Sequence, residues 1–304
     1  MKRVLITGGA GFIGSNLAQR LHDNYEVIVL DDLSTGLKSN LENLNLKFVE
    51  GSILEGKVVD ELFEERIDVI VHLAALGSVP RSIAEPRPTF ETNVLGTFEL
   101  LEKSRIHNSH FIFASSSSVY GNNLDSPKNE KSWVSPISPY GASKLSGEAF
   151  SVSYANAFNL KISTFRFFNV FGPKQRPDHQ YAAVIPKWIN AALNNSELEI
   201  YGDGEQTRDF TYVDDLINCL EITIEKELNF KGVVNLAFGT RISLNEILQL
   251  LTTHFPNLKF KYLAERTGDI RDSKSDPTNL RKLFGDLTHT TFEKALTETI
   301  NWLK

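Results

Sequence analysis

Short apolar runs alternate with amphipathic segments through the first half of the chain. The apolar runs have the length and composition of buried parallel strands, and they cover residues 3–7, 26–31, 47–50, 68–73, 110–115 and 161–167. Between them, apolar positions recur with helical spacing over residues 12–24, 57–65, 93–107 and 140–158. This alternation predicts an α/β fold, a doubly wound parallel sheet with helices on both faces. Ligands of such sheets bind at the carboxyl ends of the strands, so residues that follow a strand are the candidates for chemistry.

The pattern changes after Phe171. Gly172-Pro173 and Arg176-Pro177 interrupt the chain, and a helix over residues 182–194 and several short strands are predicted to follow. We expect residues 1–171, joined again by residues 211–238, to form the first domain. We expect residues 172–210 and 239–304 to form a smaller C-terminal α/β lobe.

Composition narrows the class of protein. The 304 residues are 41% hydrophobic and 23% charged, as is typical of a soluble globular enzyme. No apolar run approaches the ~20 residues that cross a bilayer, and the run after Met1 is too short for a signal peptide, so we expect a cytoplasmic protein without a membrane partner. The single cysteine, Cys219, excludes an internal disulfide and a cysteine-cluster metal site, and no metal is expected. The net charge of −6, without a basic stripe, argues against a nucleic-acid partner.

Glycines at positions 8, 11 and 14 lie between the first predicted strand and the first predicted helix. Glycines at this turn permit a tight bend and let the backbone approach a pyrophosphate, and the helix N-terminus offers free N–H groups to the phosphates. Asp31 ends the second strand, where its carboxylate can accept both adenosine ribose hydroxyls and would repel the 2′-phosphate of NADP. The pattern therefore predicts a Rossmann-type domain that binds NAD.

Tyr140 and Lys144 are four residues apart at the start of a predicted helix, so both side chains can face one ligand. A tyrosine with a pKa of about 10 is a poor base at neutral pH, but a neighbouring ammonium and the positive nicotinamide ring favour the phenolate. Ser116 belongs to a run of four serines after the fifth predicted strand, where its hydroxyl can donate to a substrate oxygen and share a proton with Tyr140. A tyrosine and a lysine at this spacing are usually ordinary surface residues. Their position after the glycine loop and the serines makes them a candidate proton-transfer pair.

The candidate NAD-binding residues come from the carboxyl ends of the predicted strands, the loop after Asp31 and the reactive pair. They are Gly8, Gly11, Phe12, Ile13, Gly14, Asp31, Asp32, Ser34, Thr35, Gly36, Ser52, Ile53, Leu73, Ala74, Ala75, Tyr140 and Lys144.

Longer motifs make the chain similar to a known family. The glycine loop, the segment Val119-Tyr120-Gly121, the Tyr140/Lys144 pair and the segment 166–172 occur in the order typical of the extended short-chain dehydrogenases/reductases. The chain resembles this family over essentially its whole length. Within the family, segments 72–82, 181–188, 201–210 and 266–271 resemble those of bacterial UDP-N-acetylglucosamine 4-epimerases of surface-polysaccharide pathways.

The resemblance implies the catalytic roles. Ser116 occupies the family's catalytic serine or threonine position, four residues before Tyr120. Tyr140 would be the base, and Lys144 its partner and the anchor of the nicotinamide ribose. A homodimer formed by helices 93–107 and 140–158 of each subunit is also implied.

The resemblance implies the substrate contacts as well. Asn169 would lie near the substrate diphosphate and Tyr201 against the uracil. Arg208 and Arg266 would bind the diphosphate, which suits the fork of a guanidinium, and Asp269 would accept the uridine ribose hydroxyls. The full set of implied substrate contacts is Gly77, Ser78, Ser116, Ser117, Tyr140, Asn169, Gln175, Val184, Tyr201, Arg208, Arg266, Asp269 and Ser273.

Two positions bear on the sugar. UDP-galactose 4-epimerases restricted to plain hexoses carry a bulky tyrosine where this chain has Ser273, and often a lysine where it has Gly77. Small residues at both positions leave volume for a 2-acetamido group. One position departs from the family, which has an acidic residue for the adenine amino group where this chain has Ser52. His72 has no evident chemical role, and a packed histidine behind the cofactor loop is the expected interpretation.

The implied activity is NAD-dependent 4-epimerisation of a UDP-sugar, UDP-GlcNAc to UDP-GalNAc and back, through a 4-keto intermediate. Two other substrates stay open. One is UDP-glucose. The other is UDP-glucuronate, whose carboxylate Arg81 could meet and for which decarboxylation is also an alternative to epimerisation. A 4,6-dehydratase would need an Asp-Glu pair where this chain has Ser117 and Ser118. A non-catalytic NAD-binding regulator would not need the Tyr140/Lys144 pair.

Overall fold

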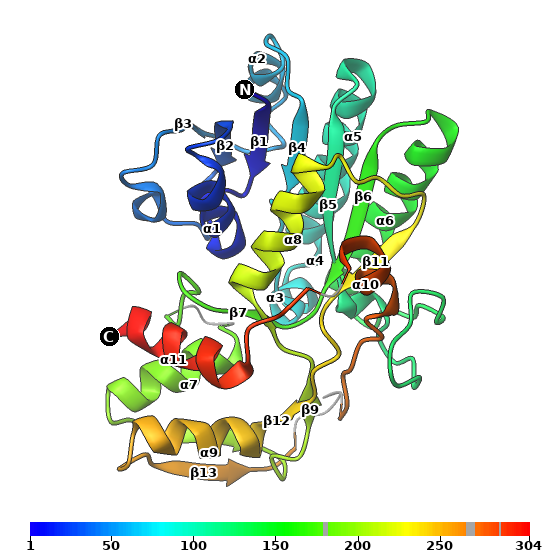
Figure 1. Cartoon of the computed structure of the whole chain (residues 1–304). Coiled ribbons are helices and arrows are strands. Elements are labelled where there is room, and N and C mark those ends of the chain that lie inside the picture. The colour runs from blue at the N-terminus through cyan, green and yellow to red at the C-terminus, as the bar shows by residue number, and fades with distance from the viewer. Residues whose placement is uncertain (179–181, 266–270, 286) are drawn as a thin grey trace. The chain divides into compact units, whose positions relative to one another are not determined.

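The structure is a computed structural model that describes residues 1–178, 182–265, 271–285 and 287–304 (Figure 1). The chain divides into two compact units. The first unit comprises Met1–Asn123, Trp133–Phe167 and Ile217–Val234. The second comprises Leu124–Ser132, Phe168–Leu216 and Asn235–Lys304.

A seven-stranded sheet in the order β11-β6-β5-β4-β1-β2-β3 forms the centre of the first unit. Its strands are β1 (Arg3–Thr7), β2 (Glu26–Asp31), β3 (Lys47–Glu50), β4 (Val69–His72), β5 (His110–Ser116), β6 (Ile162–Phe167) and β11 (Val233–Leu236). Strands β1 to β6 pair in parallel with their neighbours. Strands β4, β5 and β6 are buried at every residue, which explains why they read as continuous apolar runs. The predicted doubly wound parallel sheet is confirmed.

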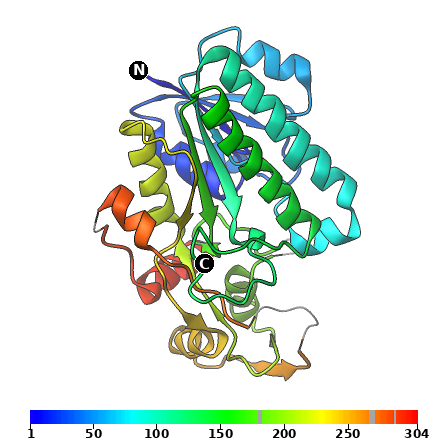
Figure 2. The ribbon, with the colours of Figure 1, turned by 90° about the vertical axis from the view of Figure 1, so that its right-hand side faces the viewer.

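Helices cover both faces of this sheet. They include α1 (Phe12–Leu21), α2 (Gly56–Leu62), α3 (Val79–Ala84), α4 (Pro86–Phe90), α5 (Gly96–His107) and α6 (Pro139–Ala157), with α8 (Val213–Glu225) entering the unit at Ile217. Figure 2 shows α5 and α6 side by side on the face turned to the viewer, where α5 contacts β5 and α6 contacts β5 and β6. Helix α1 packs on β1 and β2 from the other face. Helix α6 begins where it does because the Ser138 side chain caps the Gly141 N–H and Pro139 follows.

The predicted helix over residues 93–107 differs in one detail. The structure has a π-helical turn at Glu91–Leu95 that runs directly into α5. Such turns widen a helix locally and are frequent at functional sites. No periodicity of apolar positions distinguishes a π-turn from an α-helix over so few residues, so the sequence does not predict it.

The second unit is a set of short paired strands and helices. Its strands are β7 (Val170–Phe171), β8 (Leu198–Tyr201), β9 (Thr207–Arg208), β10 (Thr211–Tyr212), β12 (Ile242–Ser243) and β13 (Phe260–Leu263), which pair as β10 with β7, β12 with β9 and β13 with β8. Its helices include α7 (Val184–Leu193), α9 (Leu244–His254), α10 (Thr278–Phe284) and α11 (Phe292–Leu303). Helix α9 begins with a complete capping box between Ser243 and Glu246. The predicted helix at 182–194 is present as α7.

Among the described residues, no helix has both the length and the apolar content needed to cross a bilayer.

Candidate active site

The glycine loop leads from β1 into α1. Gly8 has φ +71°, a left-handed conformation that disfavours side chains, and a Cβ there would lie 2.7 Å from the Ala74 nitrogen. A Cβ at Gly14 would lie 2.3 Å from the Gly8 carbonyl oxygen. Gly11 is the N-cap of α1 and makes no side-chain hydrogen bond, so the first-turn N–H groups of α1 have no capping side chain. A bare backbone in front of an uncapped helix N-terminus fits the diphosphate of NAD.

Asp31 is buried at the end of β2 and ties the glycine loop to the following turn. Its carboxylate accepts the Ala10 N–H at 2.9 Å and the Leu33 N–H at 2.8 Å. Burial raises the pKa of this carboxyl, and the two backbone hydrogen bonds oppose that rise. A Cβ at Gly36 would lie 2.9 Å from the same carboxylate, so the loop after β2 closes tightly over Asp31. The candidate ribose ligand therefore also has a structural role.

Further candidate cofactor residues lie in the loop after β2, in the segment after β3 and in the segment after β4. Asp32 accepts both the N–H and the hydroxyl of Ser34, which shapes the turn that also contains Thr35. The Ser52 hydroxyl oxygen accepts the Leu54 N–H at 3.2 Å, and Ile53 is buried in the core. Leu73, Ala74 and Ala75 follow β4. The Leu73 N–H donates to the Thr7 carbonyl at 3.1 Å, which holds this segment against the end of β1.

Tyr140 and Lys144 lie in the first turns of α6, and the structure brings both to the end of β5. The Tyr140 phenol shares a hydrogen bond with the Ser116 side chain. The Lys144 ammonium donates to the Ala114 carbonyl at 2.8 Å and stands 5.2 Å from the centre of the Phe113 ring. The predicted triad therefore forms one group within the first unit, in which Ser116 and Lys144 are buried and Tyr140 is half-buried.

Burial dominates the electrostatics of this pair. It lowers the pKa of Lys144 to about 8. It also raises the pKa of Tyr140, and the hydrogen bond with the Ser116 side chain only partly opposes the rise. From the sequence we expected the lysine to lower the pKa of the tyrosine, but in the protein alone the burial of the phenol determines the direction of the shift. The positive nicotinamide ring of bound NAD acts on the phenol in the opposite direction.

The side chains of the four serines at the end of β5 diverge. The Ser116 hydroxyl donates to the Ser118 hydroxyl at 3.1 Å and accepts the Ser118 N–H at 3.1 Å, and Ser117 begins the next turn. Ser115 points to the opposite side, where its hydroxyl donates to Glu148 at 2.6 Å. Alternation along a strand explains this divergence, because successive side chains point to opposite faces.

Several residues that hold Tyr140 in place were missed in the sequence. The Tyr140 N–H donates to the Ser82 hydroxyl at 3.1 Å, and the Tyr140 carbonyl accepts from the Ser143 hydroxyl at 2.8 Å. Asn93, in the π-helical turn, donates to Ser143 at 3.0 Å and accepts the Leu76 N–H at 2.8 Å. The sequence offered one signal for these residues: they are polar, yet helical spacing places them on a buried face.

A buried ion pair behind the triad was also missed. Arg166 in β6 forms a two-point contact with Glu148 in α6, at 2.8 and 2.7 Å, and both side chains are 4% exposed. Burial lowers the pKa of Arg166, but the hydrogen bond and charge of Glu148 outweigh that effect and raise it above its usual value. The guanidinium also lies 4.6 Å from the centre of the Tyr120 ring. The pair joins α6, β5 and β6 directly below the reactive side chains.

Gly77 and Ser78 precede α3. A Cβ at Gly77 would meet nothing within 4 Å, so this position borders open space. The Ser78 hydroxyl caps α3 by accepting the Arg81 N–H at 3.2 Å.

In the second unit, the segment 207–211 gathers three candidate substrate residues. Asn169 donates to the Asp209 carbonyl at 3.2 Å, Ser273 donates its N–H to the Thr207 carbonyl at 3.1 Å, and Arg208 itself lies in β9. Asp209, which the sequence reasoning did not single out, is fully buried. Its carboxylate accepts the Ser275 N–H at 2.8 Å, the Ser275 hydroxyl at 2.6 Å and the Thr240 hydroxyl at 2.9 Å.

The remaining candidates of this unit lie near its strand ends. Gln175 donates to the Val170 carbonyl at 3.2 Å, while its side-chain oxygen is buried and has no hydrogen-bond partner within the described part of the chain. Tyr201 ends β8, and Val184 begins α7. Arg266 and Asp269 lie outside the described residues, as does Tyr181 of the motif 181–188.

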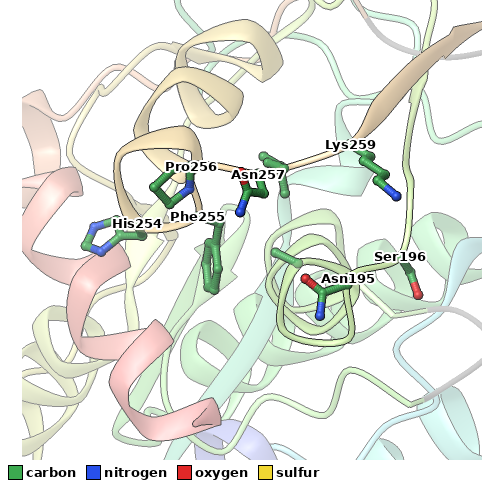
Figure 3. Close-up of a pocket in the computed structure, with 9 residues that line it drawn as sticks. Asn195, Ser196, His254, Phe255, Pro256, Asn257 and Lys259 are labelled. Carbon is green, nitrogen blue, oxygen red and sulfur yellow. The ribbon is translucent and has the colours of Figure 1, made fainter.

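A pocket of about 190 Å³ opens in the second unit between the ends of α7 and α9 (Figure 3). It is lined by Ala192, Asn195, Ser196, His254, Phe255, Pro256, Asn257, Leu258 and Lys259. None of the candidate site residues that the structure describes lines it. Within the described ranges, no group of three or more histidine, cysteine or carboxylate side chains is arranged to hold a metal ion.

Comparisons with known proteins agree with this geometry. Residues 4–237 match the model of the NAD dependent epimerase/dehydratase family. The chain is 38% identical over 247 residues to the dTDP-D-glucose 4,6-dehydratase of Dictyostelium discoideum, over 74% of this chain but only 56% of that protein's length. It is 33% identical over 311 residues to the UDP-glucose 4-epimerase of Mycolicibacterium smegmatis, over 99% of this chain and 98% of that one.

The fold also matches solved structures. One is the UDP-N-acetylglucosamine 4-epimerase from Methanobrevibacter ruminantium M1 in complex with UDP-N-acetylmuramic acid, with a TM-score of 0.93, 38% identity and coverage of 99% and 98% of the two chains. The family model covers more than half of the chain, and its matched residues include the glycine loop, Asp31 and the Tyr140/Lys144 pair. The chain therefore belongs to the NAD-dependent epimerase/dehydratase family of extended short-chain dehydrogenases/reductases, and its cofactor is NAD.

Proposed function

We propose that the protein is a UDP-sugar 4-epimerase that interconverts UDP-GlcNAc and UDP-GalNAc and supplies precursors for surface polysaccharide. The observation that carries the proposal is the group of Ser116, Tyr140 and Lys144 at the end of β5. Serines at positions 117 and 118 favour epimerisation over 4,6-dehydration, because neither can exchange protons with C5 and C6 of the sugar as a carboxyl pair would.

The side chains of the triad divide the work of proton transfer. Tyr140 takes the proton of the sugar 4-hydroxyl, and Ser116 holds that oxygen through its own hydroxyl. Lys144, anchored on the Ala114 carbonyl, places a positive charge next to the phenolate and binds the nicotinamide ribose. NAD, held by the glycine loop and Asp31, would supply a reversible hydride acceptor for C4. The 4-keto sugar turns about its diphosphate link before the return, so Tyr140 gives the proton back to the opposite face.

We assign NAD and the nucleotide sugar to different parts of the chain. Residues 1–171 with 211–238 would bind NAD, through the glycine loop, Asp31 and the segment after β4. Residues 172–210 and 239–304 would bind the nucleotide sugar. Arg208 and Ser273 support this assignment, since Arg208 lies in the segment 207–211 and Ser273 bonds to it; Asn169, just before the boundary, also bonds to that segment.

Three features support an N-acetylated sugar. Ser273 is small, Gly77 borders open space, and the Gln175 side-chain oxygen is a buried acceptor without a partner among the described residues. An acetamido group would add volume next to such small residues, and it offers an N–H donor for such an acceptor. A plain hexose also has a donor at that carbon, its 2-hydroxyl, but it lacks the added volume.

The substrate assay tests the proposal directly. The protein is incubated separately with UDP-GlcNAc, UDP-Glc and UDP-GlcA, and the products are resolved by chromatography and mass spectrometry. We expect UDP-GalNAc from UDP-GlcNAc without loss of mass. Loss of water would identify a dehydratase, and loss of carbon dioxide from UDP-GlcA a decarboxylase. Conversion of UDP-Glc with none of UDP-GlcNAc would refute the acetamido assignment.

Ser273→Tyr is expected to reverse the preference for sugars. The added ring would fill the volume assigned to the acetamido group, so kcat/KM for UDP-GlcNAc should fall by about tenfold to a hundredfold while that for UDP-Glc changes little. Ser196→Tyr, at an exposed position of the same unit, is the matched control and should leave both values unchanged. Equal losses for both sugars would mean that Ser273 does not line the sugar pocket.

We also propose a homodimer formed by α5 and α6 of each subunit. The support is apolar surface on and beside these helices, where Leu95, Ile106 and Phe158 are 45%, 61% and 50% exposed. Clusters of this kind on a globular protein mark interaction sites. Sedimentation velocity should give the mass of two chains at micromolar concentration, and a monomer there would contradict the proposal.

A further inference from the structure

His72, the last residue of β4, lies buried between two threonines. Its Nδ1 is 2.8 Å from the hydroxyl of Thr7, the last residue of β1, and its Nε2 is 2.9 Å from the hydroxyl of Thr97 in the first turn of α5. The ring also stacks on Phe113, with centroids 5.9 Å apart. The family mechanism gives this residue no task, and packing alone would not require both ring nitrogens to be bonded.

The neighbouring hydrogen bonds determine which nitrogen carries the proton. The Thr97 hydroxyl donates its hydrogen to the Asn93 carbonyl at 2.7 Å, so towards His72 it can only accept. Nε2 must therefore carry a hydrogen. In a neutral ring Nδ1 is then an acceptor, and the Thr7 hydroxyl donates to it. The Thr7 oxygen in turn accepts the Ala74 N–H at 3.3 Å.

The ring is neutral for a separate reason. Burial and, as the smaller cause, the charge of Lys144 together lower the pKa of His72 to about 3. The hydrogen bonds thus run in one direction, from the Ala74 N–H through Thr7, His72 and Thr97 to the Asn93 carbonyl. Only one tautomer satisfies every donor and acceptor along this path.

Both ends of the path touch the active site. Thr7 directly precedes Gly8, whose Cβ position lies 2.7 Å from the Ala74 nitrogen, so β1 and the segment after β4 are at closest approach there. At the other end, Asn93 donates to Ser143, and Ser143 donates to the Tyr140 carbonyl. A shift of the ring would move the glycine loop and the Tyr140 backbone relative to each other.

We propose that His72 is a positioning residue, which as the neutral Nε2–H tautomer sets the spacing between the glycine loop and the π-helical turn and so aligns the NAD site with Tyr140. It does not touch the reacting atoms. A histidine that only packed would be replaceable by an apolar ring at a cost in stability alone.

His110 provides the matched control. It is buried in the next strand, and its Nε2 is 2.9 Å from the Ser163 hydroxyl, which donates to the Leu228 carbonyl. It therefore has the same tautomer by the same reasoning, but at the amino end of β5, where no candidate site residue of the described chain lies. His72 and His110 differ in position along the sheet rather than in burial.

Nitrogen-15 NMR of the protein without NAD tests the tautomer. His72 should show the neutral Nε2–H form from about pH 5 to about pH 9, without titrating. An Nδ1–H form, or protonation within that range, would overturn the proposal. This measurement uses the native chain and does not depend on any variant folding.

Substitutions test the positioning role through NAD affinity. His72→Phe should raise the dissociation constant of NAD by about tenfold, as expected for losing two buried hydrogen bonds that hold the site together. His72→Asn keeps an acceptor for Thr7, and His72→Gln keeps a donor for Thr97, so each should recover part of the loss. His110→Phe should lower the unfolding temperature but leave NAD affinity unchanged.

If His72→Phe fails to fold, the isosteric variants Thr7→Val and Thr97→Val provide the test, because each removes a hydroxyl that bonds to one side of the His72 ring. Each is expected to weaken NAD binding severalfold, and the double variant should lose less than the sum because both act through one path. If these variants bind NAD as tightly as the native protein, His72 only packs.

Discussion

Replacing Tyr140 with phenylalanine lowers kcat by about 10³-fold or more and leaves NAD bound, because the substitution removes the proton acceptor and little else. The ring stays between the same neighbours, and the backbone bonds to Ser82 and Ser143 do not involve the phenol. Turnover of UDP-GlcNAc measures the first effect, and NAD content of the purified protein the second. Near-normal activity would show that another group is the base.

Tyr154→Phe is the matched control for this variant. Tyr154 lies on the same helix, and its hydroxyl donates to Glu102 at 2.5 Å, away from the Ser116 side chain. It should keep full activity. The pH profile gives a further check, because the phenolate is the reactive form. Since burial raises the pKa of Tyr140, the activity of the native protein should increase as the pH rises through that pKa.

Removing the carboxylate of Glu148 is expected to destabilise the protein by about 3–5 kcal/mol, since Glu148→Leu leaves the Arg166 guanidinium buried without its counter-charge. The Ser115 hydroxyl loses its acceptor at the same time. Urea unfolding, followed by a spectroscopic signal from the first unit, measures the change in the free energy of unfolding. Activity should fall as well, because Glu148 links α6, which carries Tyr140, to β5, which carries Ser116, through its hydrogen bond from Ser115.

Two further variants separate the charge from the packing. Glu61→Gln removes an exposed partner of Lys57 and should change stability little, as for most surface ion pairs. The double variant Glu148→Leu with Arg166→Met replaces the buried pair by apolar groups and should recover much of the loss, because no uncompensated charge remains. A double variant as unstable as Glu148→Leu alone would show that the shape of the pair matters more than its charge.

The alternation of apolar and amphipathic segments was sufficient to predict six of the seven strands of the sheet, β1 to β6, while β11 was not predicted as a strand. Strands β1 to β6 lie within one residue of their predicted ends, because strands buried on both faces have a strong local signature. The glycine loop and the Tyr140/Lys144 pair were found for the same reason, since each is a short motif whose spacing is tied to one turn or one helix. These features led to the family and the cofactor before any contact was known.

The arrangement behind the reactive group could not be predicted in this way. The bonds from Tyr140 to Ser82 and from His72 to Thr7 join residues 58 and 65 positions apart, and the ion pair joins α6 to β6. No periodicity relates such residues. Likewise, the direction in which the pKa of Tyr140 shifts depends on how far burial removes water from the phenol. The charges that are nearby in the sequence do not reveal this. Motifs encoded over a few residues therefore identify the chemistry of this protein, while packing between distant segments determines the protonation states and positions through which that chemistry acts.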